Sequence, residues 1–260
     1  MYTTQGFVLR KYNIEEADRM YIIYTKDYGK KNLFCKGALK IKSKLSPHLA
    51  EFADADFDFV KGKSVEKIVG ARMEKSFVNI RGDLRKIAIG NFILDAIDNL
   101  IKPDHPDREI YILIKKALEI IDGHKDIRKA YFSANIFIWK LLILLGYKPE
   151  FDKCAKCGMK LKEPYFDERT GEFFCGECFR RRAGAGSRDG LYREKIPPNP
   201  PLQRGGERTP LCRSSLEYLK GNPMAEVNFD EIIFIVKSFM RLHLEKVLKS
   251  EVWITKLFDY

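Results

Sequence analysis

The chain has 260 residues, of which 45% are hydrophobic and 12% aromatic. That apolar content excludes a globally disordered protein, because it can bury a sizeable core, and at about 100–200 residues per domain the length predicts one to three domains. Lysine and arginine number 47 against 36 aspartate and glutamate residues, a net charge of +11, which favours an anionic partner such as nucleic acid or an acidic surface.

No targeting or membrane segment is predicted. The opening residues, MYTTQGFVLRKYN, lack the basic, apolar and small-residue regions of a signal peptide. The most apolar run, residues 130–146, contains Asn135 and Lys140 and is shorter than the roughly 20 residues that span a bilayer. We therefore expect a cytoplasmic protein with no membrane partner, in which thiols stay reduced.

The first 80 residues predict a small β-barrel. Gly29 suits the turn of a hairpin, and β-rich runs occur at 6–9, 20–25, 32–39, 52–60 and 65–77. Residues 52–60 alternate with period two, so Asp54, Asp56 and Asp58 are expected on a water-exposed face. Five short strands fit a five-stranded barrel, with an SH3-like barrel as the alternative.

Helical periodicity follows the barrel. Apolar residues repeat at helical spacing in 83–101, 107–122, 126–145 and 230–249. Asp83, Asp107 and Asp126 begin the first three runs and are predicted N-caps. Because four amphipathic helices can bury their apolar faces against one another, we expect an α+β protein in which an α-helical bundle follows the barrel.

Four of the six cysteines form two CxxC pairs in the pattern C-x2-C-x17-C-x2-C, namely Cys154, Cys157, Cys175 and Cys178. This spacing is typical of a zinc site in which two knuckles supply four thiolates. Tetrahedral zinc then has no open position, so we predict one structural Zn ion per chain. Two disulfides, a redox pair and an iron–sulfur cluster are the alternatives.

Residues 183–212 are different in composition from the rest of the chain. They contain five of the eleven prolines and five glycines, with almost no hydrophobic periodicity. Proline removes backbone donors and glycine raises the entropy cost of ordering, so a disordered Gly/Pro-rich insertion is predicted here.

Lysines are concentrated between residues 26 and 44, where Asp27 is the only acidic residue. Lysines neutralise phosphates without reading sequence, and aromatic faces stack on bases. Five aromatic residues lie near these lysines in the sequence, namely Tyr12, Tyr21, Tyr24, Tyr28 and Phe34. Aromatic side chains in a small barrel also form its core, which is the alternative role for these five. We therefore predict a DNA-binding face, and a solvated hairpin is the alternative. The predicted DNA-binding residues are Arg10, Arg19, Lys30, Lys31, Lys36, Lys40, Lys42 and Lys44.

No catalytic motif appears in the sequence. The four histidines lie in separate segments, and no phosphate-binding loop, G-x-S-x-G motif or dinucleotide fingerprint is present. We therefore expect the protein not to be an enzyme. The alternatives are a nucleic-acid-modifying enzyme and an RNA-binding or ribosome-associated barrel protein, each with an OB domain and a zinc ribbon.

The order of these parts and several short strings resemble the bacterial DNA repair protein RecO family. Gly6-Phe-Val-Leu-Arg and then Glu16-Ala-Asp-Arg19 resemble the first strand of the family and the turn after it. Tyr28-Gly29-Lys30, followed by Lys36-Gly37-Ala38, Lys40 and Ser43, resembles its hairpin and loop, and residues 239–250 resemble its last helix. The resemblance covers nearly the whole chain except 183–212.

The resemblance implies an OB-fold domain in 1–80, a helical domain in 81–150 and 213–260, and a zinc module in 151–182 beside the insertion at 183–212. It implies a recombination mediator that binds single- and double-stranded DNA, anneals complementary strands and helps to load RecA on gapped DNA coated with SSB. RecR and SSB are the implied protein partners. A monomer is expected, in the bacterial cytoplasm and associated with the nucleoid.

Overall fold

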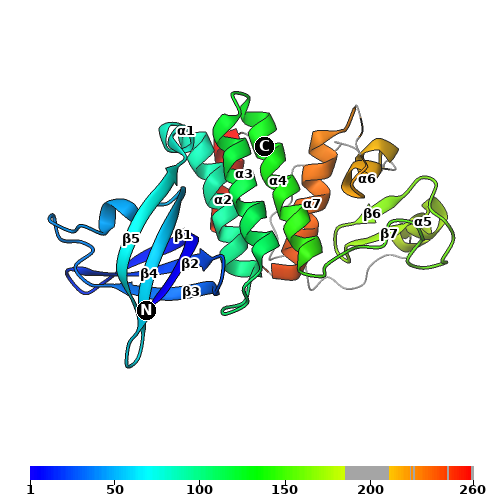
Figure 1. The fold of residues 1–260 in the computed structure, drawn as a ribbon. Coiled ribbons are helices and arrows are strands. Elements are labelled where there is room, and N and C mark those ends of the chain that lie inside the picture. Colours follow the sequence, from blue (N-terminus) through cyan, green and yellow to red (C-terminus); the bar gives the residue numbers. More distant parts are fainter. Residues whose placement is uncertain (185–210, 223, 225, 245, 259–260) are drawn as a thin grey trace. The chain divides into compact units, whose positions relative to one another are not determined.

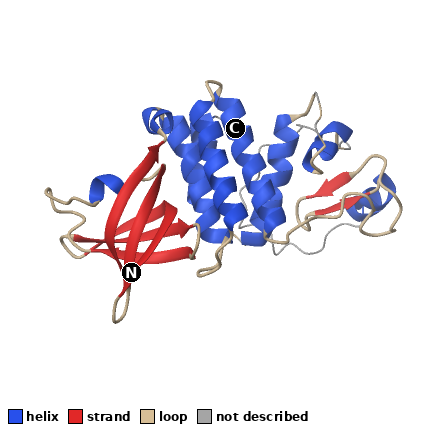
Figure 2. Ribbon diagram, in the orientation of Figure 1, coloured by secondary structure: helices blue, strands red, loops and turns tan. Residues whose placement is uncertain are grey.

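The computed structural model describes residues 1–184, 211–222, 224, 226–244 and 246–258 (Figure 1). The insertion predicted at 183–212 lies outside the described residues, except for its first two and last two positions. The chain forms two compact units, Met1–Phe137 with Leu248–Asp259, and Ile138–Val247. Figure 2 shows that the described strands belong to one N-terminal barrel and one small hairpin, with helices elsewhere.

A closed five-stranded barrel begins the first unit, as predicted, with the strand order β1-β2-β3-β5-β4. The strands are β1 (Tyr2–Ile14), β2 (Asp18–Thr25), β3 (Gly29–Cys35), β4 (Ala53–Lys61) and β5 (Glu66–Ser76). Neighbouring strands are antiparallel except for a short parallel contact between β3 and β5, which closes the barrel. Buried side chains such as Tyr21, Leu33 and Phe57 fill its interior.

The third strand is shorter than the predicted run 32–39. β3 ends at Cys35, and Gly37 has a φ of 68°, a conformation that glycine adopts without steric cost. The Gly37 N–H donates to the Asp18 carboxylate at 2.7 Å, and the Leu39 N–H donates to the carbonyl of Ala17 at 2.9 Å. These bonds turn the chain away from the sheet into a loop that contains a short 3-10 helix, η1 (Ser46–His48).

Three helices of the first unit begin directly after the predicted capping aspartates, whereas its first and last helices were not predicted. The unit contains α1 (Val78–Gly82), α2 (Leu84–Leu100), α3 (Arg108–Gly123), the first half of α4 (Ile127–Leu144) and α8 (Lys249–Phe258). Asp83, Asp107 and Asp126 each accept a hydrogen bond from the backbone N–H two residues ahead, which confirms the three N-caps. α8 lies against α2, where the Ser250 N–H donates to Asp95 at 3.3 Å.

The predicted helix at 230–249 was wrong at its C-terminal end. The structure has α7 (Phe229–Leu244), and a separate helix, α8, begins at Lys249. The chain passes from the second unit to the first at Leu248, so the two helices bury their apolar faces in different cores. Buried Leu248 accepts from the N–H groups of Glu251 and Val252, which starts the new helix.

The expectation that Asp54 faces water was also wrong. Its side chain is buried beneath α3, where it accepts hydrogen bonds from the Tyr111 hydroxyl at 2.7 Å and the Lys115 ammonium at 2.8 Å. Asp56 and Asp58 remain partly exposed. Strand alternation placed these three aspartates outside the barrel correctly, but part of that outer surface is covered by a helix.

The second unit contains the cysteine-rich segment. Its elements are the end of α4, the hairpin of β6 (Tyr165–Asp167) and β7 (Glu172–Phe174), and the helices α5 (Gly176–Gly184), α6 (Arg213–Leu219) and α7. Trp139 of α4 packs against Phe151 and Phe239, and its indole N–H donates to the carbonyl of Leu219 at 2.9 Å. Among the described residues, no helix is long and apolar enough to cross a membrane.

Candidate nucleic-acid interface and metal centre

The loop between β3 and η1 presents a cluster of exposed positive charge. Lys36, Lys40, Lys42 and Lys44 are all exposed, and none forms an ion pair with a described residue. Their ammonium groups are therefore available to an external anion. We call residues 36–44 the basic loop.

Successive turns fix the backbone of the basic loop. The Lys40 N–H donates to the Gly37 carbonyl at 3.1 Å, and the Ser43 N–H donates to the Lys40 carbonyl at 2.9 Å. The Ser46 N–H then donates to the Ser43 hydroxyl oxygen at 3.3 Å. Because buried Ala38 and Leu49 anchor the segment in the barrel core, its lysines project from an ordered backbone.

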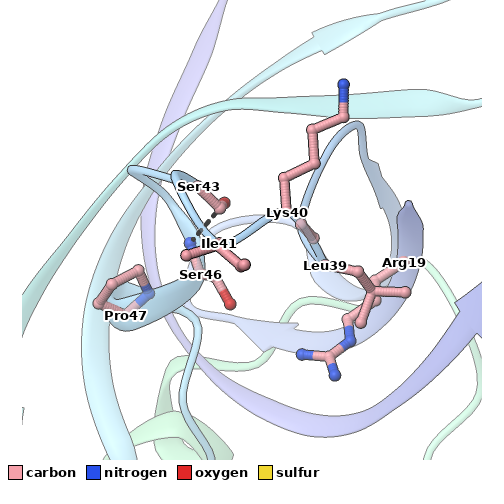
Figure 3. Close-up of a pocket in the computed structure, with 8 residues that line it drawn as sticks. Arg19, Leu39, Lys40, Ile41, Ser43, Ser46 and Pro47 are labelled. Carbon is pink, nitrogen blue, oxygen red and sulfur yellow. Dashed lines mark hydrogen bonds between the residues drawn. The ribbon is translucent and has the colours of Figure 1, made fainter. Parts of the chain in front are cut away.

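A shallow cavity of about 360 Å³ lies between the basic loop and the start of β2. It is lined by Arg19, Ala38, Leu39, Lys40, Ile41, Ser43, Ser46 and Pro47 (Figure 3). The Arg19 Nε donates to Asn13 at 3.0 Å, and the charged ends of Arg19 and Lys40 point away from each other in the close-up. The cavity therefore has one basic side chain from a strand and one from the loop, with two hydroxyl groups between them.

The other predicted DNA-binding residues are engaged with acidic side chains. Arg10 pairs with Asp95 at 3.0 Å and with Asp98 at 3.2 Å, and Lys30 also pairs with Asp98, at 3.5 Å. Burial lowers the pKa of Lys30, and the nearby Asp98 opposes that effect. In the part of the chain that the structure describes, the positive charges of Arg10 and Lys30 are therefore compensated by aspartates, unlike those of the basic loop.

Lys31 is compensated as well. Its ammonium lies 2.8 Å from Asp104 and 3.4 Å from Glu66, and the hydrogen bond to Asp104 raises its pKa. Of the eight predicted residues, the structure brings together Arg19 and the four lysines of the basic loop. The acidic partners of the other three come from distant positions in the sequence, and no local pattern indicated them.

Two of the five interleaved aromatic side chains contribute to the barrel core, since Tyr21 lies in it and Tyr28 packs against it. Tyr21 and Tyr24 are fully buried, and the Tyr24 hydroxyl donates to the carbonyl of Asp107 at 3.2 Å. Burial raises the pKa of Tyr21, an effect that the adjacent Arg19 and Ser46 partly offset. Tyr12 is the exposed member of the predicted set. Stacking of bases on Tyr21 or Tyr24 is therefore excluded in this conformation.

The four predicted metal ligands converge in the second unit. The sulfur atoms of Cys154, Cys157, Cys175 and Cys178 all lie within 4.8 Å of one another. Gly158, with a φ of 70°, closes the first knuckle by donating its N–H to the Cys154 carbonyl at 2.9 Å. The second knuckle follows β7 and enters the first turn of α5.

The donor set and its spacing fit a tetrahedral thiolate site. Zn–S bonds of about 2.3 Å in a tetrahedron place sulfur atoms about 3.8 Å apart, and the Cys157 and Cys175 sulfurs are separated by 3.8 Å. All six cysteines, these four included, are free thiols. Among the described residues this is the one cluster of potential ligands that could hold a metal ion.

The backbone around Cys154 favours a thiolate. Burial disfavours its charged form, but backbone N–H groups of Cys157, Cys175 and Lys156 donate to the sulfur and lower the pKa to about 6. Burial and the neighbouring sulfurs raise the pKa of Cys178 to about 12. Four adjacent thiols therefore resist full ionisation unless a cation compensates their charge.

The chain matches two protein-family models and several known proteins along most of its length. Residues 1–77 match the family model "Recombination protein O N terminal", and residues 81–189 match "Recombination protein O C terminal". The chain is 28% identical to the DNA repair protein RecO of Caldanaerobacter subterraneus over 98% of each chain. It is 30% identical to that of Dehalococcoides mccartyi, over 70% of this chain and 72% of the relative.

Proposed function

Because the chain belongs to the RecO family of DNA repair proteins, which are repair mediators and not enzymes, we propose that it is a recombination mediator. In this proposal the chain binds single- and double-stranded DNA and anneals complementary strands. It also helps to load RecA on gapped DNA coated with SSB, together with RecR.

The observation that carries the proposal is the basic loop of the OB-fold barrel. Four exposed lysines, with no acidic partner in the described part of the chain, stand on a backbone held by hydrogen bonds, and Arg19 lies at the adjoining cavity. Contacts to phosphate release condensed counterions, and this supplies affinity without sequence preference. A mediator that acts on any gapped DNA needs this kind of recognition.

Annealing follows from charge and proximity. A strand held by the basic loop has part of its phosphate charge neutralised, which weakens its repulsion of a complementary strand. A second strand bound to the same protein meets the first at a high effective concentration. Base pairing then supplies the specificity, and the protein needs no catalytic group.

For the four cysteines, we propose one zinc ion with a structural role. Zinc bound there would cross-link the knuckle at Cys154–Cys157 to the start of α5, with the backbone N–H groups at Cys154 supporting thiolate charge. We further propose the domain division 1–80, 81–150 with 213–260, 151–182 and 183–212, and a monomeric protein at the nucleoid in the bacterial cytoplasm.

The test is annealing of complementary oligonucleotides coated with SSB. The variant carries alanine at Lys36, Lys40, Lys42 and Lys44. The matched control carries alanine at four exposed lysines outside the loop, Lys102, Lys116, Lys125 and Lys129. Both variants lose four charges, so the proposal expects slow annealing for the loop variant and nearly normal annealing for the control. Equal rates for the two variants would contradict the assignment of the DNA-binding surface.

A further inference from the structure

Ile41 is an exception among the apolar residues of its segment. Ala38 and Leu49 are buried, and Leu45 packs against the barrel core, whereas Ile41 is fully exposed. It follows Lys40 in the turn closed by the Ser43 N–H and the Lys40 carbonyl, so it stands at the corner of that turn. The fold therefore orders the surrounding backbone while leaving this one branched apolar side chain in water.

The charges around Ile41 indicate what it meets. Lys40 precedes it and Lys42 follows it, and both are exposed and without a described acidic partner. An apolar protein surface does not need two flanking cations, whereas a nucleotide strand presents anionic phosphates beside apolar base faces. Single-stranded DNA, whose bases are accessible, matches this alternation of charge and apolar surface.

We propose that Ile41 is an apolar wedge that packs against the bases of single-stranded DNA while Lys40 and Lys42 hold the phosphates on either side. The inference rests on the proposed DNA-binding function and adds base contact to it. Apolar side chains inserted between bases disturb stacking. A wedge at the basic loop would keep bases of the bound strand separated from their neighbours and accessible to a second strand.

The cavity beside Ile41 suits the next phosphate of the strand. The hydroxyl groups of Ser43 and Ser46 line it, and Arg19 and Lys40 supply positive charge at its edges (Figure 3). Beside it, the hydroxyl of buried Tyr21 makes no hydrogen bond to any described residue. The turn thus presents an apolar tip and an anion-binding recess on one short segment.

The test compares Ile41→Ser with a control, Ile120→Ser, which changes a half-exposed isoleucine on α3. Partial burial of an isoleucine side chain corresponds to about a fivefold change in affinity. Ile41→Ser should therefore bind mixed-sequence single-stranded DNA about fivefold more weakly than wild type. Its binding to duplex DNA, whose bases are stacked, should change less than twofold, and Ile120→Ser should change neither.

The salt dependence separates this inference from the proposed function. Ile41→Ser removes no charge, so its slope of log K against log salt should equal that of wild type. Unchanged affinity of Ile41→Ser, beside weak binding by the loop lysine variant, would overturn the wedge and leave the DNA-binding surface standing. Unchanged DNA binding by both Ile41→Ser and the loop lysine variant would overturn the wedge and the DNA-binding surface together. Equal losses on single-stranded and duplex DNA would also overturn the wedge.

Discussion

The ion pair between Lys115 and Asp54 attaches α3 to the barrel, since the Lys115 ammonium lies 2.8 Å from the buried carboxylate of Asp54. Replacing Lys115 therefore tests how much this attachment stabilises the protein. Lys115→Met keeps most of the side-chain volume but removes the charge. Asp54 is 1% exposed, so water cannot replace the lost partner. Removing one member of a buried pair costs about 3–5 kcal/mol. We expect about 3 kcal/mol, because the Tyr111 hydroxyl still donates to Asp54 at 2.7 Å and Lys115 itself is 38% exposed.

The free energy of unfolding is measured at pH 7 by urea titration followed by circular dichroism. Lys116→Met is the matched control, since Lys116 is exposed and has no described ionic partner; it should change stability by less than about 0.5 kcal/mol. Adding Asp54→Asn to Lys115→Met should recover part of the loss, because no buried charge then remains. The reasoning fails if Lys115→Met is as harmless as Lys116→Met.

Three further predictions address the metal, the loop and the packing of α2. Metal analysis of protein purified in reducing buffer should give one zinc per chain, and less than half an equivalent in wild type would contradict the site. Cys154→Ser should lower the zinc content and destabilise the second unit, since structural zinc contributes on the order of 10 kcal/mol to folding. Asp18→Ala should cost about 1–2 kcal/mol in urea titration and weaken DNA binding, because the Gly37 N–H loses its acceptor, whereas Asp18→Asn keeps an acceptor oxygen and should behave like wild type. Gly90→Ala should destabilise the protein by about 1–3 kcal/mol despite its helix propensity, because the new Cβ would lie 2.5 Å from the Phe52 ring; Gly82→Ala, with open space around it, should not, and equal melting temperatures for the two variants would refute the contact.

Local signals in the sequence predicted much of the fold. The three aspartate N-caps, the four helical segments and the convergence of four cysteines each depend on residues that lie close together in the sequence or on a short spacing rule. The barrel was also predictable, because five β-rich runs follow one another within the first 80 residues, and one of them, residues 52–60, alternates with period two. The strings that resemble the RecO family have a physical basis, since Asp18 and Ala17 bond to the turn at Gly37 and Leu39.

Features that depend on distant residues were not predictable. Alternation places Asp54 outside the barrel, but only the tertiary structure shows that Tyr111 and Lys115 cover it. Counting lysines could not separate Lys30, which is paired with an aspartate of α2, from Lys40, which forms no ion pair with any residue that the structure describes. Likewise, apolar spacing runs without a break through residues 245–249, although the chain changes from one unit to the other there.

The most direct test of the central claim is the salt dependence of single-stranded DNA binding. Each phosphate contact contributes about 0.7 to the slope of log K against log salt, so four contacts give a difference of about 3. Alanine at Lys36, Lys40, Lys42 and Lys44 should reduce the slope by about that amount, and the four-lysine control at positions 102, 116, 125 and 129 should leave it near the wild-type value. The same slope for the loop variant and wild type would contradict DNA binding through the basic loop.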